Sequence, residues 1–159
     1  MVTDNKFIVE RTNVLTDDVT LTDAYAAIDA GNFGWYGIAG QTYEFSARVV
    51  YSAAAATDGA AFSVTAGATP TQVAFISEYN TDATTVVRTA GVAIDTPDHG
   101  TASVALATGL NNAFVYGTIT PSADGFIAVS GIAENASTII AKATASVLSW
   151  KRVDWPAQP

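Results

Sequence analysis

The stretch 42-TYEFSARVVYSAAAATDGAAFSV-64 decides the fold class of this chain. Its first half alternates apolar and polar residues with a period of two, the pattern of a half-buried β-strand. Five residues share the apolar side: Tyr43, Phe45, Ala47, Val49 and Tyr51. The alternation resumes at 62-FSV-64, and Asp58-Gly59 suits a tight reversal. We therefore expect a β-hairpin whose alanine end, 53–56, is a loop tip or a contact with a neighbouring chain.

The rest of the chain continues with short alternating runs separated by turn residues. The segment 19–38 is interrupted by glycines and favours short strands, and residues 1–18 suit an N-terminal arm or a first edge strand. The sharpest turn signal is 121-PSADG-125. Further strands are expected at 73–79, 84–94, 101–107, 112–120, 125–133 and 137–150. Alanine is abundant but does not recur at helical spacing, so the pattern predicts an all-β antiparallel sandwich or barrel.

The composition is that of one folded domain. The chain has 159 residues, of which 49% are hydrophobic and 14% charged. No apolar run approaches the roughly 20 residues that span a bilayer, so we expect no membrane partner. The N-terminal segment MVTDNKFIVE lacks the pattern of a secretory signal, which favours synthesis in the cytoplasm. There is no cysteine, so packing, pairing or assembly must stabilise the fold.

The net charge of −8 argues against a nucleic-acid partner, because phosphate binding needs clustered cations and only 7 Lys and Arg are present. The acids concentrate in residues 1–100, whereas residues 101–159 are balanced. This asymmetry indicates either a solvated acidic surface or one face turned to solvent and another to a partner.

No pattern in the sequence selects a catalyst, so we expect neither enzymatic activity nor a cofactor. The single histidine, His99, lies in the turn 95-DTPDHG-100. The aspartates in that turn could hold calcium, as could Asp17 and Asp18, but neither spacing matches a known calcium loop, and we expect no metal site. Trp35 and Tyr36, beside glycines, favour a core or interface role, with a sugar platform as the alternative.

The two ends of the chain carry the residues expected to make contacts. The C-terminal segment 150-WKRVDWPAQP-159 places two tryptophans around two cations, and Trp and Arg are over-represented at binding hot spots. Trp150 could instead end the last core strand, and Trp155 could pack on its own domain. The predicted contact residues are Lys6, Phe7, Arg11, Trp150, Lys151, Arg152 and Trp155.

Three segments carry a resemblance to a known family. They are 40-GQTYEFSARVVYSAAAATDGAAFSV-64, 68-ATPTQVAF-75 and 112-NAFVYGTITPSADGFIAVSGIAENASTIIAKATASVLSW-150. Together they resemble a β-sandwich domain found in tailed-bacteriophage virion proteins, over roughly residues 21–153. The chain departs from the family at 131-GIAEN-135, where an Ala-Ser-Glu sequence is frequent.

The resemblance implies a jelly-roll sandwich over residues 19–153, with an N-terminal arm at 1–18 and a tail at 154–159. It also implies a head decoration (cement) protein that binds the outside of the capsid and stabilises it. Its partners would be the major capsid protein and other copies of itself, as a homotrimer, after synthesis in the host cytoplasm. A tail or fibre component is the alternative within this class, and a carbohydrate-binding sandwich for host attachment lies in a different class.

Overall fold

The computed structural model describes residues 10–80, 84–96, 109–136 and 138–153. Within these ranges the chain forms strands and turns and no helix, and so no helix that could cross a membrane. The strands are β1 (Arg11–Val14), β2 (Val19–Thr20), β3 (Ala26–Ala27), β4 (Gly34–Gly37), β5 (Tyr43–Ala53), β6 (Ala60–Ala66), β7 (Gln72–Asn80), β8 (Val86–Gly91), β9 (Asn111–Thr120), β10 (Gly125–Ala133), β11 (Ile139–Ala141) and β12 (Val147–Arg152).

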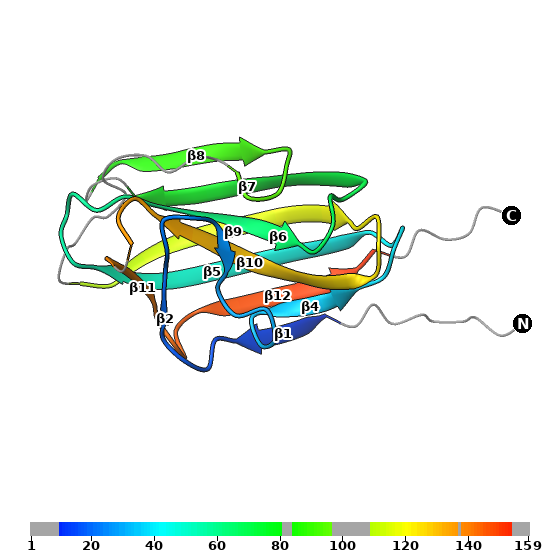
Figure 1. The fold of residues 1–159 in the computed structure, drawn as a ribbon, viewed down its shortest axis with the longest axis horizontal. Coiled ribbons are helices and arrows are strands. Elements are labelled where there is room, and N and C mark those ends of the chain that lie inside the picture. The colour runs from blue at the N-terminus through cyan, green and yellow to red at the C-terminus, as the bar shows by residue number, and fades with distance from the viewer. Residues whose placement is uncertain (1–9, 81–83, 97–108, 137, 154–159) are drawn as a thin grey trace, which may run out of the picture.

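Two antiparallel sheets form the body of the molecule (Figure 1). The larger sheet has the order β1-β12-β5-β9-β7-β8, and β11 extends it by pairing with both β5 and β2. In the smaller sheet, β10 pairs with β6, β3 and β4. The chain crosses from the larger sheet to the smaller and back three times: through β3 and β4, through β6, and through β10. The predicted all-β antiparallel sandwich is therefore confirmed.

The predicted hairpin at 42–64 is wrong, although both of its strands exist. β5 pairs with β9, β11 and β12, whereas β6 pairs with β10 in the other sheet. The alanine run is thus part of a connection between sheets, which lie about 10 Å apart in a sandwich. Asp58 closes this connection: its backbone N–H donates to the Ala55 carbonyl (3.1 Å) and its carboxylate accepts the Ala55 N–H (2.8 Å). Sequence alternation marks strands but does not show which sheet each one joins.

The core lies between the two sheets and is lined as the alternation predicts. The five apolar residues of β5 are at most 3% exposed. The rings of Tyr51 in β5 and Phe62 in β6 meet across the sandwich with centroids 5.0 Å apart. Burial raises the pKa of the Tyr51 phenol, since the charged form is disfavoured away from water. Contact between residues of separate sheets holds the layers together.

The other expected strands differ from the structure mainly at their bounds. The segment expected as one strand at 137–150 is two strands, β11 and β12, because a turn with Thr144 at φ 59° interrupts it. The buried Ser146 hydroxyl stabilises that turn by donating to the Lys142 carbonyl (2.9 Å) and accepting the Val50 N–H (2.9 Å). The strand expected at 84–94 is shorter, and the one expected at 101–107 lies outside the described residues.

Residues 11–14 form an edge strand of the larger sheet. β1 pairs antiparallel with β12, with Arg11 opposite Trp150 and Val14 opposite Val147. The described part of the chain therefore begins and ends at the same end of the sandwich (Figure 1). This pairing positions the candidate site.

Candidate functional site

Four of the predicted contact residues come together at this end. Arg11 lies in β1 and is exposed, and Trp150, Lys151 and Arg152 follow one another in the adjoining β12. Lys6, Phe7 and Trp155 lie outside the described residues. Residues almost 140 positions apart in sequence are neighbours here because β1 and β12 share a ladder.

Trp150 packs largely on its own domain. Its ring stacks on Trp35 with a centroid distance of 5.7 Å and an interplanar angle of 15°, and it meets Tyr43 edge-on at 6.1 Å. Its indole N–H donates to the Asn13 carboxamide oxygen of β1 (3.3 Å). Trp150 therefore packs as the end of the last core strand, which was the alternative expectation. Only the exposed part of its ring can contact a partner.

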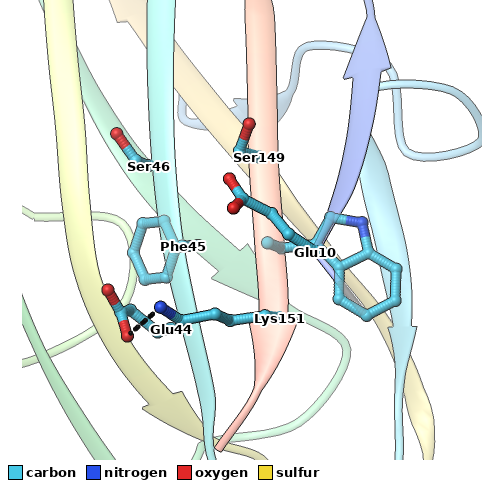
Figure 2. A pocket seen from close by; sticks show the side chains of 7 residues that line it. Glu10, Glu44, Phe45, Ser46, Ser149 and Lys151 are labelled. Carbon is cyan, nitrogen blue, oxygen red and sulfur yellow. Dashed lines mark ion pairs between the residues drawn. The ribbon is translucent and has the colours of Figure 1, made fainter. Parts of the chain in front are cut away.

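The two cations that follow Trp150 differ in their exposure to solvent. The Lys151 ammonium lies 3.0 Å from a Glu44 carboxylate oxygen of β5, and both side chains are partly exposed. Figure 2 shows this ion pair at the rim of a hollow between β5 and β12. Arg152 is exposed at the end of β12. An exposed ion pair contributes little to stability, about 0–1 kcal/mol, so the Lys151 ammonium can be redirected to an acidic partner.

The hollow itself is too small for an organic ligand. It measures about 50 Å³ and is bordered by Glu10, Glu44, Phe45, Ser46, Ser149, Trp150 and Lys151 (Figure 2). Binding pockets for small organic molecules are typically about 300–1,000 Å³. This hollow can hold a few water molecules at most. The site can therefore act as a contact surface rather than as a substrate cavity.

Larger depressions lie elsewhere on the surface. A groove of about 350 Å³ crosses the strands β7, β8 and β9 and is lined by Ala74, Ile76, Ala90, Val92 and Tyr116. Its lining is almost entirely apolar, so it offers contact area and little capacity for proton transfer or metal binding.

The core role that the sequence favoured for Trp35 is confirmed, and the alternative of a sugar platform at Trp35 is wrong. Trp35 faces the core, where it is 3% exposed and contacts Tyr43, Phe45 and Trp150. Its indole N–H has no hydrogen-bond partner in the part of the chain that the structure describes. The neighbouring Tyr36 is 55% exposed on the opposite face of β4, because successive residues of a strand point to opposite sides.

The aspartates considered for calcium hold loops in place. The Asp95 carboxylate accepts the hydroxyls of Thr65 (3.0 Å) and Ser130 (2.9 Å), which fixes the segment after β8 on the smaller sheet. Asp18 accepts the Lys142 ammonium and the Ala143 N–H (2.7 Å), and the Lys142 hydrogen bond lowers the pKa of Asp18. Among the described residues no group of acids or histidines could hold a metal. Asp98 and His99 lie outside them.

Phe126 is an exposed aromatic residue that was not among the predicted contact residues. Phe126 is 52% exposed and meets Tyr36 edge-on, with centroids 5.5 Å apart and an interplanar angle of 89°. A signal existed, since Phe126 alternates with Ile127 and Val129 and so must face away from them. The alternation alone does not show which face of β10 is covered by the other sheet, so it could not identify Phe126 as exposed.

Comparisons with known proteins find weak likeness only. No family model and no curated protein matches this chain. Among solved structures, it is similar to chains from the infectious bursal disease virus Gx strain (TM-score 0.26, 12% identity), the Gt strain (0.26, 11%) and the VP2 subviral particle of that virus (0.25, 12%). These matches cover 98%, 98% and 97% of this chain and 41%, 47% and 41% of theirs, so it spans less than half of their length.

Proposed function

We propose that this chain is a bacteriophage virion structural protein, a head decoration (cement) protein that binds the outside of the capsid and stabilises it. Its role is adhesive rather than enzymatic. Its partners are the major capsid protein and other copies of the chain, as a homotrimer, and it is made in the host cytoplasm. The family resemblance of residues 21–153 supports this class, and the sandwich fits the jelly-roll form that the resemblance implies.

One observation carries the mechanism: the first and last described strands, β1 and β12, lie side by side. β1 begins at Arg11, opposite Trp150 of β12. An extended residue spans at most about 3.6 Å, so Phe7 stays within about 15 Å of Arg11, and Trp155 within about 11 Å of Arg152. The contacts predicted for the N-terminal arm and for the C-terminal tail can therefore form on one patch of the capsid surface.

Many weak contacts on one particle would make such a coat stable. Each apolar contact contributes roughly 25 cal/mol per Å² buried, and linked copies bind with a raised effective concentration. The exposed cations Arg11 and Arg152 add attraction toward an acidic shell surface, with a dependence on salt.

Deletion of residues 1–9 tests the proposal. This deletion stops before β1, so the sandwich should fold as before. We expect reduced occupancy on purified particles and a similar loss in the double variant Lys6→Ala/Phe7→Ala. The matched control Val86→Ala/Arg88→Ala removes one exposed hydrophobe and one cation from β8, and it should bind normally.

Two outcomes would count against the proposal. Unchanged occupancy after the deletion would remove the arm from the mechanism. Binding of the intact chain to purified tails and not to heads would replace the decoration role with the tail or fibre alternative.

A further inference from the structure

An exposed apolar patch lies on the outer side of the smaller sheet. Tyr36 in β4 and Phe126 in β10 are register partners, both about half exposed, with their rings in edge contact. Ile38, two residues after Tyr36, is 48% exposed. Single exposed hydrophobes are ordinary on protein surfaces, but grouped ones mark contact sites. We call these three residues the aromatic patch.

A preformed hollow adjoins the aromatic patch. It measures about 170 Å³ and lies beside Phe126, with small walls that include Ala66, Ala68 and Ala123. Two contacts fix its rim: the Asp124 carboxylate accepts the Ala39 N–H (2.8 Å), and the Pro121 carbonyl accepts the Gly40 N–H (2.9 Å). The patch thus combines projecting rings with a rigid recess, so little ordering is needed on binding.

The aromatic patch belongs to the end of the sandwich where the described chain begins and ends. The Ile38 N–H donates to the Tyr43 hydroxyl (3.0 Å), and Tyr43 is the register partner of Arg152. Figure 1 shows the β9–β10 turn at this same end.

Charge is balanced at this end and unbalanced elsewhere. Among the described residues, three cations and three acids lie here: Arg11, Lys151, Arg152, Glu10, Glu44 and Asp124. The remaining described residues carry eight acids against three cations. Copies of a chain with net charge −8 repel one another over most of their surface, and this end is where they can approach at the lowest electrostatic cost.

We propose that copies of this chain meet through the aromatic patch around a symmetry axis. The inference deepens the proposed function, because it locates the self-association that a homotrimer requires. A symmetric contact brings the same patch of every copy together, so each copy supplies both rings and recess. The two half-exposed rings offer about 100 Å² each, well below the roughly 800 Å² per partner of a standard interface. Self-association is therefore weak in solution and is strengthened when copies are held on one particle.

Sedimentation equilibrium of the full chain over about 1–200 μM, a range that brackets micromolar affinity, tests the inference. We expect an average mass that rises above one chain with concentration. Tyr36→Ser/Phe126→Ser should weaken association at least tenfold. The control Val86→Ser/Val92→Ser alters two exposed hydrophobes outside the patch, 54% and 81% exposed, and should associate normally. Raising the salt concentration should strengthen association, because it screens the repulsion between acidic bodies.

A parent chain that stays monomeric over the whole range would overturn the inference, as would a folded patch variant that associates like the parent. Occupancy on particles separates this result from the proposed function. A monomeric patch variant that still occupies particles supports both, whereas a parent chain that self-associates but never binds particles refutes the function alone.

Discussion

Two glycines beside Phe75 of β7 have no room for a side chain. A Cβ at Gly91 of β8 would lie 2.1 Å from the ring atom Cζ of Phe75. A Cβ at Gly117 of β9 would instead lie 2.2 Å from the Ala74 carbonyl oxygen and 2.5 Å from the Phe75 Cα. The first clash involves the far end of a side chain, and the second involves the backbone of β7. The two alanine variants should therefore respond differently to trimming Phe75.

The magnitudes follow from these contacts. Overpacking a core typically costs about 1–3 kcal/mol, so we expect about 2–3 kcal/mol for Gly91→Ala. Gly117→Ala must also push apart the β7 and β9 ladders, at about 1 kcal/mol per weakened hydrogen bond, for about 3–5 kcal/mol in all. Gly67→Ala is the control, because a Cβ there has no atom within 4 Å, and it should lie within about 0.5 kcal/mol of the parent.

Urea unfolding measures these differences. With a slope near 2 kcal/mol per molar urea, the Gly117→Ala midpoint should fall by about 2 M. In a Phe75→Leu background, the cost of Gly91→Ala should fall by about 1–2 kcal/mol, while that of Gly117→Ala should not change. Equal costs of Gly91→Ala in both backgrounds, or a Gly117→Ala chain as stable as the parent, would refute the packing described here.

Three further predictions concern contacts at the edges of the sandwich. Trp150→Ala should lower the free energy of unfolding by about 2–3 kcal/mol, since the stacked ring is half-buried. Trp150→Phe should lower the free energy of unfolding by less, and urea midpoints measure both changes. Asp95→Ala leaves two hydroxyls without their acceptor and should cost about 2–4 kcal/mol by the same measurement, with Asp95→Asn losing about half as much. The pKa of Asp18 is lower in the folded chain than in the unfolded one, so its ionised carboxylate stabilises the fold above the unfolded pKa near 3.9. This stabilisation is lost as the pH falls through the lower pKa of the folded state. The difference in melting temperature between the parent and Asp18→Asn should therefore shrink steadily as the pH falls below about 3.9, and a difference that stays constant would contradict the assignment.

Much of the strand content could be predicted because alternation is a local property. The strands at 43–53, 72–80, 111–120 and 125–133 lie close to their predicted ranges, since each buries one side of a pleat. The break between β11 and β12 was missed, because the Ser146 hydroxyl stabilises it through Val50, a residue almost 100 positions away.

The candidate contact site was predictable only in part. The residue types at the two ends of the chain pointed to contacts, but the sequence did not show that Arg11 lies opposite Trp150. Nor did it distinguish the buried Trp35 from the exposed Tyr36, since that distinction depends on which side of β4 faces the other sheet.

The amino-acid order alone determined that this chain forms pleated strands, that it has an acidic body, and which side chains along β5 avoid water. Backbone geometry and composition act within a few residues, so these properties need no knowledge of distant segments. The tertiary structure alone decided that β5 and β6 belong to different sheets, that Trp35 is covered by Trp150, and that Tyr36 and Phe126 meet at the surface. Those outcomes depend on pairing between segments far apart in the chain, where many registers satisfy the same local pattern and only the packed core selects one.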